Sequence, residues 1–140
     1  VKERSAGGDT YVQFSLPSFE GRMNLFLDTY PRLEEIAVAA PPAFRKAREL
    51  DLRVALCHQC QVPPCIVPDD VQHLESMWFS DTPKMWSHDR AYGEACGSCA
   101  LRPRCSGVWK GYADQFGVAA LRPFSPADVD PSLATGPGQP

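Results

Sequence analysis

The six cysteines of this 140-residue chain constrain its fold more than any other feature. Three of them form the run Cys96-Gly-Ser-Cys99-Ala-Leu-Arg-Pro-Arg-Cys105, which has the pattern C-x2-C-x5-C, and Cys65 stands upstream of it. A C-x2-C pair can place two sulfurs on one metal or cluster, because the turn between them brings the side chains together. Cysteine thiolates bind soft metals, in iron–sulfur clusters and in zinc sites. The sequence therefore predicts a soft-metal site formed by Cys65, Cys96, Cys99 and Cys105.

The overall composition is that of an ordinary globular protein and argues against several other classes. Hydrophobic residues make up 44% of the chain, charged residues make up 22%, and the formal net charge is −3. Because the chain is negatively charged as a whole, we expect neither nucleic acid nor an anionic membrane as a partner. No apolar run approaches the roughly 18–20 residues that span a bilayer. The clustered cysteines favour metal binding in the reducing cytoplasm over a secreted disulfide framework.

Residue patterns divide the chain into four segments. Residues 1–9 are polar and glycine-bearing, and we expect them to form a tether. Residues 10–56 alternate between strand and helix patterns, which predicts an α/β fold. Residues 57–123 hold all six cysteines and are predicted to be a loop-rich extension held together by metal. Residues 124–140 are rich in Pro, Gly, Ser and Asp, and we expect a flexible tail.

Within the second segment, the pattern predicts a strand over 10–16, a helical region over 22–50 and a strand over 52–56. Strand, helix and strand in this order are typical of an α/β repeat unit. Pro31 is expected in the first turn of a helix, where its missing N–H is harmless. Pro41-Pro42 is expected to end that helix and begin a second one, because proline disrupts the hydrogen bonds of a helix interior.

Cys57 and Cys60 form a second C-x2-C pair, which leaves the metal open to two interpretations. Combined with the pair Cys96 and Cys99, they would form a four-cysteine zinc ribbon. The gap between the pairs is longer than the roughly 15–20 residues of the common ribbon, and two cysteines of the chain would have no role. A single [4Fe–4S] cluster instead uses the whole C-x2-C-x5-C run with Cys65 as fourth ligand. We therefore favour iron over zinc.

The residues around the cysteines are predicted to shape the metal site. Gly107 follows the last cysteine closely, and its missing side chain would let the backbone approach the bound group. Trp109 and Tyr112 would cover the site and shield it from water. The three histidines, His58, His73 and His88, are predicted to be surface or packing residues. The sequence contains no P-loop, dinucleotide fingerprint, zinc-protease motif or hydrolase nucleophile motif, so no residue is assigned a catalytic role.

Two stretches of the chain resemble the C-terminal portion of radical S-adenosylmethionine enzymes. The first is similar to the later part of their β/α barrel, and it reads Ala47-Arg48-Glu49-Leu50-Asp51-Leu52-Arg53-Val54 followed by Val62-Pro63-Pro64-Cys65. The second resembles their auxiliary-cluster (SPASM or twitch-like) extension, and it comprises Cys96 to Val108, Tyr112, Gly117 and Leu121-Arg122-Pro123. The resemblance implies a partial (β/α) barrel over 10–56 and an auxiliary [4Fe–4S] extension over 57–123. It implies Cys65, Cys96, Cys99 and Cys105 as the ligands of that cluster.

The same resemblance implies a supporting function, in substrate positioning or electron transfer. The C-x3-C-x2-C loop that binds the catalytic cluster of these enzymes is absent from the chain, so whether the chain alone is an enzyme stays open. S-adenosylmethionine binding would belong to the full-length enzyme, which would act on a peptide or small molecule. The chain begins with Val1, and we expect it to be part of a longer protein. Its partner would be the N-terminal radical S-adenosylmethionine core, in the same polypeptide or as a missing half.

The cysteine pattern also resembles that of WhiB-like [4Fe–4S] transcriptional regulators. Gly107-Val108-Trp109-Lys110-Gly111 is similar to the Gly-Val-Trp-Gly-Gly turn of those proteins. In this chain the turn follows the last cysteine directly, where the regulators have a helix between. Residues 124–140 contain no Lys or Arg, whereas the regulators end in a basic DNA-binding segment. A WhiB-like regulator and a structural zinc-binding domain are the two alternatives.

Overall fold

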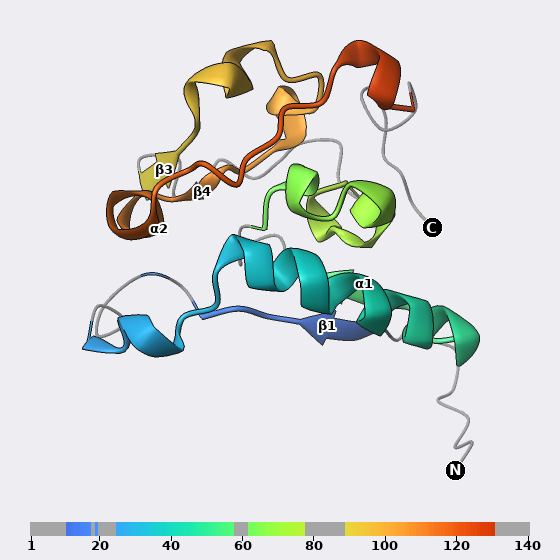
Figure 1. The fold of residues 1–140 in the computed structure, drawn as a ribbon. Coiled ribbons are helices and arrows are strands. Elements are labelled where there is room, and N and C mark those ends of the chain that lie inside the picture. Colours follow the sequence, from blue (N-terminus) through green and yellow to red (C-terminus); the bar gives the residue numbers. More distant parts are fainter. Residues whose placement is uncertain (1–10, 18, 20–24, 58–61, 78–88, 131–140) are drawn as a thin grey trace.

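The computed structural model describes residues 11–17, 19, 25–57, 62–77 and 89–130 (Figure 1). Its helices and strands, in chain order, are β1 (Val12–Phe14), α1 (Leu33–Glu49), β2 (Val54–Leu56), β3 (Arg90–Ala91), β4 (Val108–Trp109) and α2 (Lys110–Phe116). Short 3-10 turns connect them over much of the remaining described chain. Within the described ranges, no helix is both long and apolar enough to cross a membrane.

The N-terminal half is a strand–helix–strand unit. β1 and β2 pair in parallel with Val12 opposite Val54, and α1 lies between them in the sequence and against the sheet in space (Figure 1). The predicted order of strand, helix and strand is therefore present, with shorter strands than expected. The described sheets have two strands each and form no closed barrel, so the partial barrel stays a prediction.

The prolines of α1 correct two expectations from the sequence. The helix begins at Leu33, after Pro31, and it runs unbroken through Pro41 and Pro42 to Glu49. Each proline removes one N–H from the helix, which leaves the carbonyls of Ala37 and Val38 without their usual donors. Val38 is 77% exposed, so this side of the helix faces water, which can satisfy those carbonyls. The prolines therefore interrupt hydrogen bonds without ending the helix.

Burial on both sides of the proline pair favours a single helix. Ile36 lies before the pair, Phe44 and Ala47 lie after it, and all three are buried on one face of α1. Phe44 is completely inaccessible to solvent. Burying a phenylalanine side chain stabilises a protein by about 1.5–3 kcal/mol, which offsets part of the cost of about 3 kcal/mol for each of the two interior prolines, and the burial of Ile36 and Ala47 adds to it. Two separate helices would lose the common alignment of these side chains.

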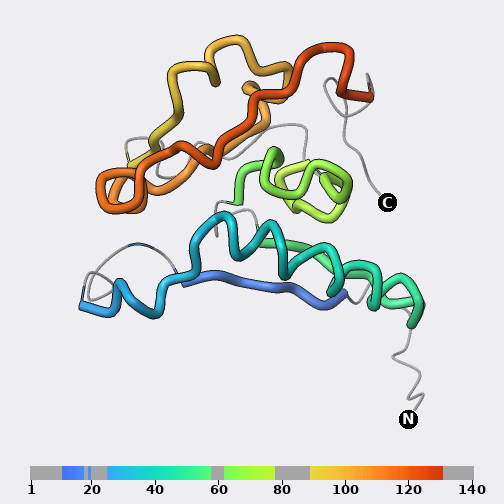
Figure 2. The backbone as a smooth tube through the Cα atoms, in the orientation of Figure 1, coloured from blue at the N-terminus to red at the C-terminus, as the bar shows by residue number. Residues whose placement is uncertain are grey.

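The segment 62–77 joins the two halves of the molecule. It is a series of 3-10 turns that lies between α1 and the chain from 89 to 130 (Figure 2). Asp70 is buried and accepts a hydrogen bond from the Arg48 guanidinium of α1, at 2.8 Å. His73 stacks on Phe44 with 4.8 Å between ring centroids. These contacts hold the segment against the helix and thereby set the position of Cys65, which lies near its start.

The C-terminal half contains little regular structure. β3 and β4 form a two-residue antiparallel pair, and α2 spans seven residues. The hydroxyl of Tyr112 in α2 accepts a hydrogen bond from the Leu33 N–H at the start of α1, at 2.9 Å. The tail was expected to begin at residue 124, but Phe124 packs against the core and Val129 is buried. The packed chain therefore extends further than its composition predicts, and residues 131–140 lie outside the described part.

Candidate metal centre

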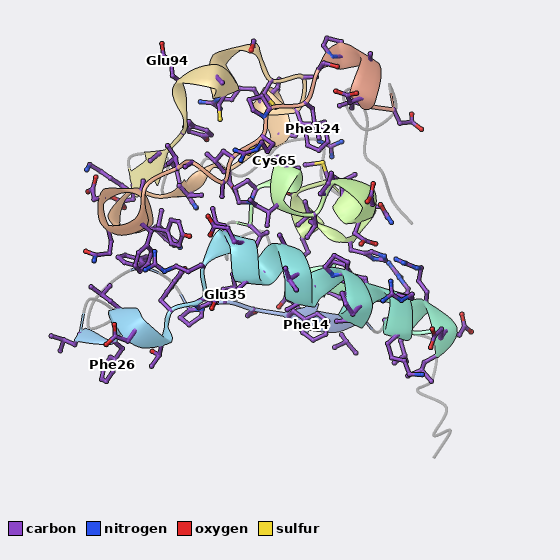
Figure 3. The ribbon with its side chains drawn as sticks, viewed as in Figure 1. Phe14, Phe26, Glu35, Cys65, Glu94 and Phe124 are labelled. Carbon is purple, nitrogen blue, oxygen red and sulfur yellow. The ribbon has the colours of Figure 1, made fainter. Side chains whose placement is uncertain are left out.

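The sulfur-bearing side chains of Cys65, Cys96, Cys99 and Cys105 line one cavity. They come from two separate parts of the chain, because Cys65 lies on the 62–77 segment and the other three lie between residues 89 and 130. Apolar side chains form most of the remaining wall, namely Pro63, Pro64, Leu101, Leu121, Pro123 and Phe124. Figure 3 shows Cys65 and Phe124 close together on neighbouring segments. The structure thus brings all four predicted ligand residues to one apolar cavity.

Tight turns orient the four cysteines. Cys65 lies in a 3-10 turn over Pro64–Ile66, and Pro63 precedes that turn in an extended conformation. Cys96 and Cys99 lie at a second turn, in which the Cys99 N–H donates to the Cys96 carbonyl at 3.2 Å. Cys105 follows a third turn over Arg102–Arg104. Because 3-10 turns close over three residues, they direct side chains of a C-x2-C pair toward the same region.

Backbone N–H groups point at three of the four sulfurs. The Gly107 N–H donates to Cys105 Sγ at 3.3 Å, and the Phe124 N–H donates to Cys99 Sγ at 3.4 Å. Burial raises the pKa of the Cys65 thiol, and a hydrogen bond from the backbone N–H of Arg122 offsets part of that rise. Hydrogen bonds to a sulfur favour the thiolate, which is the form that binds metal. Three of the four sulfurs therefore already accept backbone hydrogen bonds, which would stabilise the negative charge of a thiolate.

Burial acts in the opposite direction on the same thiols. Loss of solvent raises the pKa of Cys105 to about 12, and the other three sulfurs add to this rise. Burial also raises the pKa of Cys65, with a further contribution from the nearby Cys96 and Cys99. Without a cation, these two side chains would be neutral thiols at neutral pH. A bound metal group would supply the positive charge that makes four closely placed thiolates stable.

Gly107 occupies a position that only glycine suits. Its φ is +70°, in the left-handed region, and a Cβ there would lie 2.6 Å from the Ala91 carbonyl oxygen. The same Cβ would lie 2.7 Å from the ring of Tyr92. Gly107 also lines the cavity beside Cys105. The backbone at Gly107 therefore closely approaches β3 and the following tyrosine, and its predicted approach to a bound group stays a prediction.

The residues expected to cover the site lie elsewhere. Trp109 and Tyr112 are buried in the core beside α1 and do not line the cavity. They lie beside Leu33 and Ile36 of α1 instead, within the apolar core. Leu121 and Phe124 cover the sulfurs instead, together with Tyr92 and Leu101. Sequence reasoning missed Phe124 because it stands at the start of a polar, proline-rich stretch.

The other cysteines and the histidines lie outside this cavity or outside the described residues. Cys57 follows β2, is half-buried and is not among the residues that line the cavity. Cys60, His58 and His88 lie outside the described residues, so nothing tests their expected roles. His73 stacks on Phe44 and contacts the Val54 carbonyl at 3.2 Å through Nδ1, as expected of a packing residue.

The spacing of the sulfurs bears on the kind of metal group. Among the described His, Cys, Asp and Glu residues, no three side chains lie close enough together to hold one metal ion. With Zn–S bonds of about 2.3 Å, a tetrahedral zinc site requires sulfurs about 3.8 Å apart. In an iron–sulfur cubane each thiolate binds a different iron, so the sulfurs lie farther apart around the inorganic core. Which metal group the four cysteines would hold stays a prediction.

Comparison of the chain with protein-family models, with curated proteins and with solved structures found no match. The resemblance to radical S-adenosylmethionine enzymes therefore gains no support from known relatives and stays a prediction. Only residues of this chain support a metal centre. Those residues are the four cysteines, the apolar wall around them and the backbone N–H groups directed at their sulfurs.

Proposed function

We propose that the chain binds an auxiliary [4Fe–4S] cluster through Cys65, Cys96, Cys99 and Cys105. One observation carries this proposal: four thiols from distant parts of the chain line one apolar cavity. Buried thiols with raised pKa values are unfavourable to ionise together unless a cationic group binds them. The donor set is entirely sulfur, which matches the preference of iron–sulfur clusters.

The cavity wall suits a group that must be kept from water. Leu121, Pro123 and Phe124 contribute apolar side chains to this wall, as do Pro63 and Pro64. A low-dielectric wall and N–H donors to sulfur are two of the features that set the reduction potential of such clusters. When bound, the cluster would supply one-electron transfer or a rigid anchor for a substrate. The residues of this chain would hold it, orient it and exclude solvent.

The wider proposal is that this chain serves as the C-terminal part of a radical S-adenosylmethionine enzyme. The exposure of β1 among the described residues supports this, since parallel strands are usually buried on both faces and Val12 and Phe14 are 46% and 41% exposed. Phe14, Leu16 and Ile36 line an apolar groove between β1 and α1. The partner would be the N-terminal core in the same polypeptide or a separate half. That core would bind S-adenosylmethionine and a peptide or small-molecule substrate in the cytoplasm.

The test is anaerobic purification or reconstitution, followed by analysis of iron, sulfide and zinc. We expect about four iron and four sulfide per chain, with brown colour from sulfur-to-iron charge transfer. Serine replacements of Cys65, Cys96, Cys99 and Cys105, one at a time, should each lower iron content strongly. Cys57→Ser is the matched control, because this half-buried cysteine does not line the cavity, and it should retain iron.

Other results would contradict the proposal in distinct ways. One zinc per chain and no iron would establish a structural zinc domain. Loss of iron in Cys57→Ser but not in Cys65→Ser would show that the fourth ligand is wrongly assigned. A salt-sensitive shift of duplex DNA by the loaded protein would favour the regulator alternative, and we expect no such shift from a chain of net charge −3.

A further inference from the structure

Arg104 is a buried charged residue within the cysteine run. It stands directly before Cys105 in the sequence, and only 6% of its surface is exposed. It is not among the residues that line the cysteine cavity. Burying a guanidinium is unfavourable unless its N–H groups find acceptors, because water otherwise solvates the charge. The acceptors of Arg104 therefore show what its burial holds in place.

The Arg104 guanidinium binds the C-terminal end of the segment 62–77. Its Nη2 donates to the Met77 carbonyl oxygen at 2.5 Å and, at the longer distance of 3.5 Å, to the Ser76 carbonyl oxygen. Ser76 and Met77 are both buried, so little water reaches their carbonyls. They belong to the 3-10 turn over Glu75–Met77, and the last carbonyls of a helical turn have no donor within it. Arg104 supplies a donor from another part of the chain.

Backbone hydrogen bonds connect this turn to Cys65, which lies near the other end of the segment. Four N–H groups of the segment donate to the carbonyl three residues earlier, at 2.9–3.1 Å, namely those of Val67, Asp70, Leu74 and Met77. The first of these bonds closes over Cys65, because it joins Val67 to Pro64. Val67, Leu74 and Met77 are also buried in the hydrophobic core. Successive closed turns with packed side chains resist bending, so a bond at Met77 restrains the position of Cys65.

We infer that Arg104 positions Cys65 as the fourth ligand of the cluster proposed for the cysteine cavity. This inference rests on the proposed function. Cys96, Cys99 and Cys105 are close in the sequence, whereas Cys65 comes from a separate segment. Arg104 links the two, because its backbone is bonded to Cys105 and its guanidinium binds the segment that carries Cys65. Loss of the guanidinium should therefore release Cys65 while the other three cysteines keep their spacing.

Arg104→Met tests this inference, because methionine keeps a long apolar side chain and removes the N–H donors. After anaerobic reconstitution, we expect iron release to a chelator to be about tenfold faster than from the parent protein, as for lost hydrogen bonds from a charged donor.

The spectrum of the oxidised protein identifies the ligand that is lost. Ferricyanide takes one electron from a [4Fe–4S]²⁺ cluster with three cysteine ligands, and the cluster then releases one Fe²⁺ and becomes [3Fe–4S]⁺. At a ferricyanide concentration that leaves the parent cluster intact, electron paramagnetic resonance of Arg104→Met should show this three-iron cluster. Cys65→Ser should give the same signal, since it removes the same ligand.

Two further variants separate positioning of Cys65 from a general loss of stability. Arg104→Lys keeps the charge and a donor, and it should recover most of the four-iron cluster. Arg90→Met makes the same change elsewhere in the segment 89–130, where the Arg90 guanidinium carbon lies 4.5 Å from the centroid of the Trp109 ring. Arg90 does not line the cavity, so this variant should lose stability without showing the three-iron signal.

The cluster signal and the folding of each variant separate the possible outcomes. A parent-like signal in folded Arg104→Met, or three-iron signals of equal size in Arg104→Met and Arg90→Met, would overturn the inference. If Arg104→Met does not fold, Arg104→Lys decides, because a single ammonium replaces the guanidinium only in part. It must then release iron faster than the parent, and an unchanged rate would overturn the inference. A parent protein that binds no iron–sulfur cluster would instead overturn the proposed function itself.

Discussion

The β1–α1–β2 unit and the segment 89–130 differ in how they are held together. The first has a 17-residue helix packed on a parallel pair of strands, with Phe44 and Leu56 among its buried residues. The second has two-residue strands, one short helix and several 3-10 turns around a cavity lined by cysteines. Apolar burial holds the first unit, and its cluster of buried side chains continues into Trp109 and Tyr112 of the second. The second unit has fewer backbone hydrogen bonds within helices and strands. Its cysteines line an apolar cavity, where ionised thiols are unfavourable.

This difference suggests that one protein can combine two kinds of folding. Where side chains form a continuous core, the free energy of burial suffices and geometry follows from packing. Where the chain closes around a cavity of ligands, metal binding contributes to folding directly, because the unfolded chain has no site to bind it. The segment 62–77 contacts both units, so Cys65 links the β1–α1–β2 unit to the cysteines of the segment 89–130.

Removal of the metal group should have the largest effect and should separate the two units. After anaerobic chelation of the loaded protein, we expect amides of residues 94–109 to lose most of their protection from hydrogen exchange. The amides of α1 should keep theirs, because the contacts of Phe44 and Ile36 do not involve the cavity. Mass spectrometry of exchanged peptides measures both at once. Equal loss in both units would show that they fold as one.

Phe44→Ala tests the packed unit. Phe44 is completely buried, so the variant should lower the free energy of unfolding by about 3–5 kcal/mol. Val38→Ala on the same helix is the control, since Val38 is 77% exposed and should change stability by less than about 0.5 kcal/mol. Urea titration followed by circular dichroism measures both variants. Similar effects of the two changes would contradict the assignment of α1 as the centre of the core.

Gly107→Ala tests the backbone conformation of the segment 89–130. The added Cβ would meet the Ala91 carbonyl oxygen at 2.6 Å in a residue with φ of +70°. We expect a loss of about 1–3 kcal/mol and faster release of iron to a chelator. Gly97→Ala is the control, because a Cβ at Gly97 would have no atom within 4 Å. Comparable iron release from the two variants would show that the left-handed turn does not constrain the site.

The smallest expected effect is a dependence of stability on pH at His73. Burial is the main cause that holds the pKa of His73 below its ordinary value of 6.5. Its Nε2 lies 3.1 Å from the Arg48 guanidinium, which can only donate, so the folded ring accepts there and stays neutral. The contribution of His73 is therefore complete above pH 6.5 and is lost as the pH falls below it, since the unfolded chain then binds the proton first.

Urea titrations from pH 7.5 down to about pH 5 measure this dependence. His73→Gln should be less stable at neutral pH and should show a flatter pH profile than the parent. A profile as steep as that of the parent would assign the dependence to other groups. Because His73 packs on α1, the effect should appear in the packed unit rather than at the cavity.

Several features of the fold follow from local sequence alone. Alternation over 10–16 and apolar spacing after Arg22 predicted a strand and a helix, and β1 and α1 lie within those ranges. Local patterns could not show that α1 would continue through Pro41 and Pro42. A proline lowers the stability of a helix through its own backbone, which the local sequence shows. The burial of Phe44 and Ala47 that offsets this loss depends on contacts with residues distant in the sequence, such as His73.

The cysteine spacing by itself indicated that Cys96, Cys99 and Cys105 would lie close together, because C-x2-C-x5-C places three sulfurs within a few tight turns of one another; tertiary structure brings Cys65 to the same cavity. Tertiary structure decided what surrounds them. Phe124 lines the cavity in place of Trp109, and the Arg102 guanidinium stacks on Tyr92. These contacts arise from packing between segments far apart in the chain. They depend on the shape and burial of the side chains, which residue spacing in the sequence does not predict.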